Sequence, residues 1–334
     1  MTDEQRKKIE ARRQRQKVSR VFSMPDMADP GVLLSPAEIT FFKTNGFLIK
    51  ERLLAEDAMR EAMARIWTHA ETALPRREGS NWRLARNNPE SWINPDWAPQ
   101  PPHPTSGPFQ GRQPREYVGS MVKLHDLGAE RYMLDLMNDN PDVNVIARAF
   151  LGNRLRQSEC IRGVYALFPQ HDEGDPQGTR RVSGTSLGPH TDQVCQQLNA
   201  CAYLEDVAAR NGGFTVYPGS HEIMFRAHNF EANWSPTDNF GACIKRVIDE
   251  IEPWELTAPR GSVIFWHGRT VHSSGIHTGR DIRWAVFADF TQDRPVLDED
   301  EHRAVLQYEW FKDAKLFRDD APVHDDMWRH WAIG

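Results

Sequence analysis

The stretch GSVIFWHGRTVHSSG at positions 261–275 indicates which kind of fold this chain adopts. Its apolar run over 262–266 predicts a buried strand, the pair His267-Gly268 a turn, and the residues from Val271 onward a second strand. Similar short runs recur at 160–168, 193–204, 214–217 and 282–290, with turn signals at 211–213 and 218–220. Because no helix of about 10–15 residues is predicted between successive strands, an antiparallel jelly roll is favoured over a parallel sheet.

The N-terminal half adds helices to these strands. Ser35 and Pro36, with Glu38 three residues after the serine, predict a capped helix start, and Gly46 predicts the helix end. A strand over 47–49, a helix over 55–74, a strand over 117–124 and a helix over 140–151 follow. We therefore expect a mainly β fold with flanking helices.

Composition narrows the class of protein. The 334 residues are 39% hydrophobic and 26% charged, which is typical of a globular chain. No apolar window approaches the ~18 residues that a membrane span needs, and a net charge of -6 argues against a general nucleic-acid-binding protein. Four cysteines without a C-x-x-C pair predict a reducing compartment, which we take to be the cytoplasm.

We predict a single domain over 31–334, preceded by a basic extension over 1–30. Residues 1–20 contain eight Lys or Arg and three acids, without the apolar segment of a secretory signal. We expect a solvated helix there, which in a homo-oligomer would pack on a neighbouring subunit; a nucleic-acid or membrane arm is the alternative. A Pro- and Trp-rich insertion over 75–115 and a C-terminal extension over 291–334 complete the predicted domain.

The motif His190-Thr191-Asp192 suggests metal chemistry. In an extended segment, residues two apart project from the same face, so His190 and Asp192 can reach one ion while Thr191 points away. A second imidazole from a distant strand would complete a 2-His-1-carboxylate site, whose remaining positions stay open. The motif alone is weak, since His324 and Asp326 have the same spacing. Both His267 and His272 are candidates for the second imidazole.

Several segments together resemble the phytanoyl-CoA dioxygenase family of iron(II)- and 2-oxoglutarate-dependent oxygenases. The resemblance runs from about residue 34 to 290 and rests on five features. They are the segment from Leu34-Ser35-Pro36-Ala37-Glu38 to Gly46-Phe47, the His190-x-Asp192 motif, the run from Tyr203-Leu204-Glu205-Asp206-Val207 to Pro218-Gly219-Ser220-His221, the stretch at 261–275, and Arg283. This family resemblance implies a double-stranded β-helix, that is, a cupin-like jelly roll.

The resemblance also implies roles for individual residues. His190, Asp192 and His272 match the iron ligands, and Arg283 matches the arginine that pairs with the distal carboxylate of 2-oxoglutarate. Ser274 matches a hydroxyl that assists this arginine. His272 is preferred over His267 because the family's spacing of 11 residues to the arginine fits only His272. The implied cofactors are Fe(II), 2-oxoglutarate and O2.

The activity implied is a dioxygenase that hydroxylates a small molecule and releases succinate and CO2. Halogenating relatives have a small residue at the position of Asp192, so its presence favours hydroxylation. The alternative is a cupin-like metal-binding protein or enzyme that does not use 2-oxoglutarate, for example with Zn2+ or Mn2+. A non-enzymatic jelly roll with core histidines and an oxygenase acting on a macromolecule are further alternatives.

Two segments without a counterpart in the family, 75–115 and 170–187, are predicted to form a substrate-facing lid. Their aromatic and basic side chains offer apolar surface and anion-pairing donors. The candidates are Trp82, Arg83, Arg86, Trp92, Trp97, Arg112, Arg180 and Arg181. The alternative is a structural flap packed on the barrel, with its arginines in water. Substrate identity does not follow from the sequence.

Overall fold

The computed structural model describes residues 19–25, 33–74, 78–93, 95–96, 115–118, 120–169, 188–192, 197–225, 227, 239–292, 326–328 and 331–334. The strands are β1 (Arg20–Phe22), β2 (Phe47–Lys50), β3 (Arg115–Val118), β4 (Met121–Leu124), β5 (Gly163–Leu167), β6 (Leu198–Tyr203), β7 (Phe214–Val216), β8 (Trp254–Leu256), β9 (Val263–His267), β10 (His272–Ser274) and β11 (Arg283–Phe290). The α-helices are α2 (Pro36–Asn45), α3 (Glu56–Ala73), α4 (Arg131–Leu136), α5 (Pro141–Leu151), α6 (Ser220–Phe225) and α7 (Phe240–Glu250), with 3-10 turns η1 (Pro89–Trp92) and η3 (His125–Ala129).

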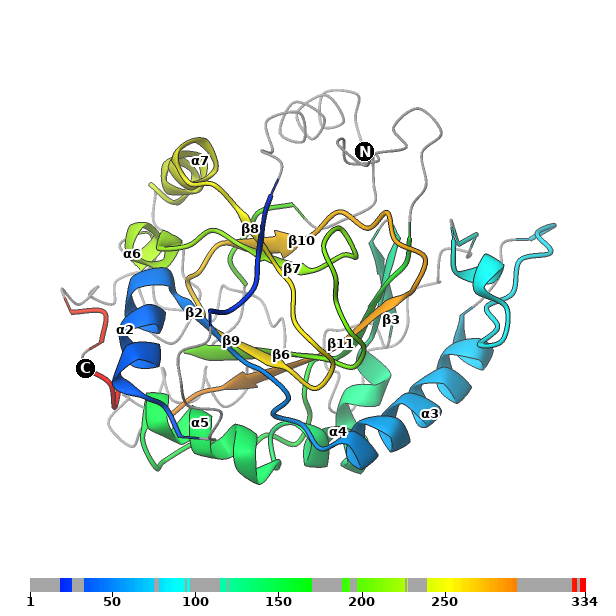
Figure 1. Cartoon of the computed structure of the whole chain (residues 1–334), viewed down its shortest axis with the longest axis horizontal. Helices are drawn as coiled ribbons and strands as arrows, with labels where there is room; N and C mark the ends of the chain where they lie inside the picture. The colour runs from blue at the N-terminus through cyan, green and yellow to red at the C-terminus, as the bar shows by residue number, and fades with distance from the viewer. Residues whose placement is uncertain are drawn as a thin grey trace.

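The strands form two facing sheets, as the prediction of a jelly roll requires. The larger sheet has seven strands in the order β2-β9-β6-β11-β5-β4-β3, and all its neighbours pair antiparallel. The smaller has four strands in the order β1-β8-β7-β10, with β1 parallel to β8. In Figure 1 helices α3, α4 and α5 lie along the large sheet on the side away from β7, β8 and β10. The mainly β fold with flanking helices is therefore confirmed.

Each strand of the large sheet divides its side chains between two cores. Phe265 and Val286 belong to the core that the sheet shares with helices α3 and α5. Their strand neighbours Ile264 and Phe287 belong to the core between the two sheets. This alternation follows from the twofold repeat of a strand. It identifies the residues that face the interior of the sandwich, where the candidate site lies.

Two predictions about individual elements were wrong. The strand predicted over 117–124 is a hairpin, in which β3 pairs with β4 and Val118 lies opposite Met121. A helix of 11 residues, α7, separates β7 from β8 although none was predicted between strands in this half. The two strands still pair antiparallel, so the helix is an insertion on one connection and not a βαβ crossover.

The predicted helix caps are confirmed. At the start of α2 the Ser35 hydroxyl accepts from the Glu38 amide, and the Glu38 carboxylate accepts from the Ser35 amide. Gly46 ends this helix in the left-handed region, with a φ of 78°. At α5, the Asn140 side chain accepts from the amides of Asp142 and Val143. These contacts satisfy backbone donors that the first helical turn leaves without intrahelical partners.

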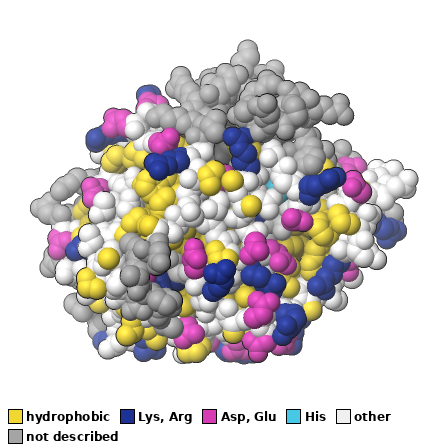
Figure 2. All heavy atoms as spheres, in the orientation of Figure 1, with side chains coloured by type: hydrophobic (Ala, Val, Ile, Leu, Met, Phe, Trp, Pro, Cys, Tyr) yellow, Lys and Arg dark blue, Asp and Glu magenta, His cyan; other side chains and the backbone are white. Residues whose placement is uncertain are grey.

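The surface agrees with the mixed charge composition. Figure 2 shows acidic and basic side chains interspersed among the described residues of this face. Among the described residues, none of the helices combines the length and the apolar character needed to cross a bilayer. Most of the predicted N-terminal extension and of the segment 291–334 lies outside the described residues, so the predicted domain organisation stays a prediction.

Candidate active site

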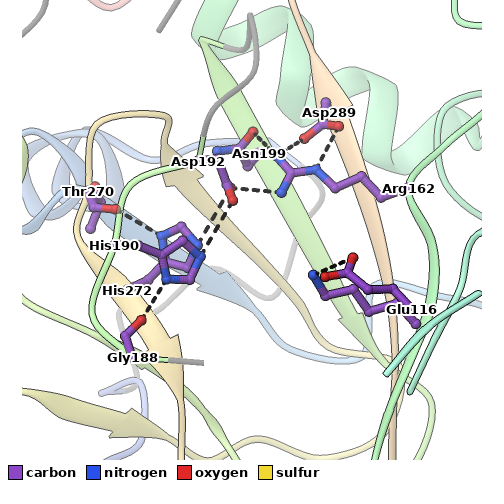
Figure 3. A network of polar contacts seen from close by, with 10 residues as sticks. Glu116, Arg162, Gly188, His190, Asp192, Asn199, Thr270, His272 and Asp289 are labelled. Carbon is purple, nitrogen blue, oxygen red and sulfur yellow. Dashed lines mark hydrogen bonds and ion pairs between the residues drawn. The ribbon is translucent and has the colours of Figure 1, made fainter. Parts of the chain in front are cut away.

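Backbone pairing places the two histidines of the predicted triad side by side. The amide of His190 donates to the carbonyl of His272 at 3.0 Å, and the amide of His272 donates to the carbonyl of His190 at 2.9 Å. This isolated antiparallel bridge joins the short segment 188–192 to β10. Asp192 follows two residues after His190, and its carboxylate turns toward both rings (Figure 3).

The three side chains converge with the geometry of a metal site. One ligand atom from each of His190, Asp192 and His272 lies within 4.8 Å of the other two. The Nε2 atom of His190 lies 3.7 Å from Oδ1 of Asp192, and Nε2 of His272 lies 3.5 Å from Oδ2. Two imidazoles and one carboxylate are the donor set of open, non-haem iron sites.

Hydrogen bonds orient both imidazoles for ligation. The Nδ1 atom of His190 lies 2.7 Å from the carbonyl of Gly188, and that of His272 lies 3.0 Å from the carbonyl of Thr270. A carbonyl only accepts, so each Nδ1 carries the proton and each Nε2 presents a lone pair toward Asp192. Such a bond to the second ring nitrogen is typical of metal-binding histidines.

The electrostatics keep His190 and Asp192 in their metal-binding forms. Burial, together with the neighbouring His272, lowers the pKa of His190 to about 4, so this ring is neutral at pH 7. Burial alone would raise the pKa of Asp192, but the charge of Arg162 and the contact with His272 hold it well below its usual value. Neutral imidazoles and an ionised carboxylate are the states in which these groups bind metal.

His267, the alternative second imidazole, lies elsewhere. It is the last residue of β9, in which Ile264 and Trp266 face the inter-sheet core. His267 therefore lies on the opposite face of the large sheet. Its ring stacks on Trp331 with centroids 5.0 Å apart, and Trp328 lies at 5.5 Å. The structure thus brings His272, and not His267, to His190 and Asp192.

The guanidinium of Arg162 forms a network that the sequence did not reveal (Figure 3). Its Nε donates to Asp289 at 2.8 Å and its Nη1 to Oδ2 of Asp192 at 2.7 Å. Its Nη2 lies 2.5 Å from the other oxygen of Asp289 and donates to Asn199 at 3.1 Å. These partners lie 30 to 127 residues away in sequence, so no local pattern could have identified them.

Arg283, the predicted 2-oxoglutarate residue, is buried on the inner face of β11. Its Nε donates to the carbonyl of Gly212 at 3.0 Å, and it is only 3% exposed. No carboxylate among the described residues pairs with it, and burial lowers its pKa. A buried cation without an acidic partner is costly, which indicates a site for an anion.

Ser274 lies on the same face of β10 as His272, because residues two apart in a strand share a face. It pairs with Phe214, two residues after the Gly212 carbonyl that receives Arg283. The strand therefore places the predicted metal ligand His272 and the predicted 2-oxoglutarate residue Ser274 on one face.

A second polar cluster, also missed from the sequence, is formed by Glu116 of β3, Lys123 of β4 and His125 of η3; Figure 3 labels its Glu116. Lys123 is 3.0 Å from the Glu116 carboxylate, and His125 is 3.5 Å from the same oxygen. Burial opposes ionisation of Glu116, but hydrogen bonding from His125 and the charge of Lys123 lower its pKa to about 2. The charge of Lys123 also makes a small contribution to the lowered pKa of His190.

The described lid candidates pack on the outer face of the large sheet. Trp92 contacts Trp67 of α3 with ring centroids 5.5 Å apart, and Trp67 in turn contacts Trp284. Trp82 and Trp92 both pack on the outer core and donate their indole N–H groups to nearby carbonyls. Arg83 and Arg86 are exposed. This favours the structural flap for residues 78–96.

The other lid candidates, Trp97, Arg112, Arg180 and Arg181, lie outside the described residues, as does the whole of 170–187. A substrate-facing role for them stays a prediction.

Two imidazoles and one carboxylate between the sheets of an antiparallel sandwich define the 2-His-1-carboxylate class of metal-dependent oxygenases. Within this class the chain belongs to the phytanoyl-CoA dioxygenase (PhyH) family, whose model matches residues 42–285. The predicted family is confirmed. Its cofactors, iron and 2-oxoglutarate, are those that the resemblance implied, and its substrates are small molecules. This assignment argues against a cupin-like protein that does not use 2-oxoglutarate.

Several solved structures are similar at low identity. The alpha ketoglutarate dependent epimerase SnoN from nogalamycin biosynthesis is 16% identical over 87% of this chain and 96% of its own, with a TM-score of 0.46. The carbocyclase SnoK from the same biosynthesis is 17% identical over 88% and 95%, with a TM-score of 0.45. EctD from S. alaskensis, solved with 2-oxoglutarate and 5-hydroxyectoine, is 15% identical over 83% of each chain, with a TM-score of 0.44. No curated protein sequence matches the chain. No residue assignment rests on these likenesses.

Proposed function

We propose that this protein is an iron(II)- and 2-oxoglutarate-dependent dioxygenase that hydroxylates a small molecule and releases succinate and CO2. One observation carries the proposal: the converging atoms of His190, Asp192 and His272 share the sandwich interior with the buried guanidinium of Arg283, which pairs with no carboxylate among the described residues. The first group fits a divalent metal. The second fits the distal carboxylate of a dicarboxylate that reaches the metal with its other end.

The local charges support this pairing of ligands. Among the described residues, the network at the triad joins two carboxylates, Asp192 and Asp289, to one guanidinium, Arg162, an excess of one negative charge. At the other end the buried Arg283 guanidinium has no carboxylate partner among the described residues. A divalent cation together with one carboxylate neutralises the first end, and a second carboxylate neutralises the other. Iron(II) with 2-oxoglutarate supplies these charges in that arrangement, and uncompensated buried charge is costly.

Each site residue then has a defined task. His190 and His272 present their Nε2 atoms, held by the carbonyls of Gly188 and Thr270, and Asp192 supplies the charged ligand. Arg283 uses its remaining guanidinium donors for a forked pair with the distal carboxylate of 2-oxoglutarate. Ser274, on the same strand face as His272, donates its hydroxyl to that carboxylate.

Apolar side chains beside the triad keep water from the reacting groups. Phe214 stacks near the His272 ring with centroids 5.1 Å apart, and Trp266 lies at 5.5 Å. Phe287 packs against both of these aromatic side chains. Bound iron and 2-oxoglutarate supply the oxidising chemistry, in which O2 is reduced while 2-oxoglutarate is split to succinate and CO2. The protein orients the substrate and excludes water.

The test is succinate release with Fe(II), 2-oxoglutarate and O2, measured against a panel of metabolites. A substrate should raise succinate release above the basal rate, and its product should gain one oxygen atom by mass spectrometry. A product of unchanged mass, or one lighter by two hydrogens, would replace hydroxylation with isomerisation or desaturation. Absence of 2-oxoglutarate binding to the Fe(II)-loaded protein would refute the proposal itself.

A further inference from the structure

Several contacts hold Arg162 in place, although the predicted reaction assigns no role to this residue. It is 3% exposed and comes directly before Gly163, the first residue of β5. Gly163 has a φ of 97°, and a Cβ there would lie 2.3 Å from the Leu124 carbonyl oxygen. Only glycine suits this position. The carbonyl of Arg162 is itself fixed by the Nδ1 atom of His125 at 2.7 Å.

The side chain of Arg162 is held by a cross-strand pair. Asp289 of β11 and Asn199 of β6 lie directly opposite each other in the large sheet. Asp289 takes the fork formed by Nε and Nη2, and Asn199 takes a second bond from Nη2. With those donors committed, Nη1 is directed at Oδ2 of Asp192, at 2.7 Å. The guanidinium is thus fixed from one side and acts on Asp192 from the other.

From this arrangement we infer that Arg162 is a positioning residue, which holds Oδ2 of Asp192 so that the carboxylate offers only Oδ1 to the metal. The inference rests on the proposed function, because it assigns Asp192 to the metal. A carboxylate free to turn could bind through both oxygens and occupy a further coordination position. A one-oxygen carboxylate with two imidazoles leaves three positions open, enough for a chelating dicarboxylate and O2.

The size of the effect follows from the behaviour of other metal sites. Groups that hydrogen-bond a ligating side chain typically change metal affinity or activity by about 10–100-fold when they are removed. Lysine in place of Arg162 keeps the positive charge but has no planar fork, so it cannot serve Asp289 and Asp192 together. Asparagine in place of Asp289 weakens the anchor while leaving the bond to Asp192, so its effect should be smaller.

The experiment uses the full chain, stripped of metal and titrated with Co(II) without 2-oxoglutarate. The variants are Arg162→Lys, Arg162→Gln and Asp289→Asn. Lys50→Gln is the matched control, because it breaks a buried ion pair of 2.7 Å with Glu38 on the outer face of the same sheet. Affinity, the visible Co(II) spectrum, which reports coordination number, and the thermal midpoint are measured for each.

We expect both Arg162 variants to bind Co(II) about 10–100-fold more weakly and to show a changed spectrum. Lys50→Gln should lose thermal stability but keep the affinity and the spectrum of the wild type. Wild-type affinity and spectrum in Arg162→Lys and Arg162→Gln would overturn the inference. If Arg162→Gln does not fold, Arg162→Lys decides alone: wild-type affinity and spectrum in that variant overturn the inference. Asp289→Asn should show a smaller change in the same direction.

A separate measurement distinguishes failure of the proposed function from failure of the inference about Arg162. Wild-type protein with anaerobic Fe(II) should develop a visible charge-transfer band when 2-oxoglutarate is added. If that band is absent while Co(II) binds to the triad, the proposed function fails. The Co(II) comparison still decides the role of Arg162.

Discussion

His267 and His272 are only five residues apart, yet they lie on opposite sides of the large sheet. His272 faces Asp192, whereas His267 stacks on Trp331. We therefore expect His272→Ala to abolish high-affinity metal binding and 2-oxoglutarate turnover, since two ligands do not hold an ion in an open site. His267→Ala should retain metal binding and lose only stability. Cobalt titration of both variants checks this, and the reverse outcome would reassign the second imidazole to His267.

Arg283 is the residue on which 2-oxoglutarate affinity should depend. Arg283→Lys keeps the charge and removes the fork that fits a carboxylate. Losing hydrogen bonds to a charged group costs about 1.5–3 kcal/mol, so the apparent constant for 2-oxoglutarate should rise by roughly one to two decades. Initial rates at varied 2-oxoglutarate measure this, with Co(II) affinity as the control. An unchanged constant would place the carboxylate elsewhere.

The residues of the candidate site differ in how well they could be predicted from the sequence. His190 and Asp192 were predicted from their spacing, and His272 and Arg283 from the resemblance to the family. Arg162 carried no signal, because its role depends on Asp289 and Asn199, which meet only when β6 and β11 pair. Glu116, Lys123 and His125 were missed for the same reason, since a hairpin and a 3-10 turn bring them together. Local patterns reveal ligands in motifs but not the groups that hold them.

At the scale of the element, the capping box of α2 should have a measurable effect of its own. The Ser35 hydroxyl and the Glu38 carboxylate each accept a backbone amide of the other residue. Ser35→Ala removes one of these bonds and should lower the free energy of unfolding by about 1 kcal/mol. Urea unfolding measures the change. Thr40→Ala, at an exposed position of the same helix, should stay within about 0.5 kcal/mol of the wild type. Equal effects of the two changes would contradict the capping role.

Element boundaries followed the sequence where a local signal existed. The ends of α2 and α5 lie at the predicted caps, and β2, β9 and β11 lie within one residue of their predicted limits. The split of β3 from β4 and the helix α7 were not predicted, although the spacing of Ile244, Val247 and Ile248 is helical. In α7, Ile244, Val247 and Ile248 face the small core that also contains Tyr217 and Val271.

Helix α6 carries a histidine that should make stability depend on pH. Burial lowers the pKa of His221 to about 4, although its ring keeps a bond to the carbonyl of Lys43 at 3.0 Å. Below the unfolded value of about 6.5, the unfolded chain binds a proton that the folded chain does not, so stability falls as pH falls. That contribution is fully present above about pH 6.5 and is lost progressively toward pH 4.

His221→Gln removes the titrating ring and keeps an N–H donor for the Lys43 carbonyl. Between pH 7.5 and pH 5 the wild type should lose up to about 2 kcal/mol more stability than this variant. Urea midpoints at the two pH values give the difference. A wild type and a variant with the same pH dependence would show that His221 is not the group responsible.

At the scale of the whole molecule, the candidate site joins the two sheets. His272 and Ser274 belong to the small sheet, whereas Arg283 and the anchors of Arg162 belong to the large one. Asp192 lies in the segment that bridges to β10. Ligands bound between these groups would therefore couple the sheets. They would also offset the charge of the buried Arg283 guanidinium, which has no carboxylate partner among the described residues.

Ligand binding should consequently stabilise the whole fold, and this can be measured without a known substrate. A ligand at 100 times its dissociation constant adds about 2.7 kcal/mol to the stability of a folded state that alone binds it. Mn(II) together with 2-oxoglutarate should therefore raise the thermal midpoint by several degrees, and chelation should reverse the rise. In Asp192→Ala the rise should vanish, because the metal loses its charged ligand. In Arg283→Lys the part due to Mn(II) alone should remain while the further part due to 2-oxoglutarate shrinks. A full rise in Asp192→Ala would mean that the stabilising metal binds outside the triad.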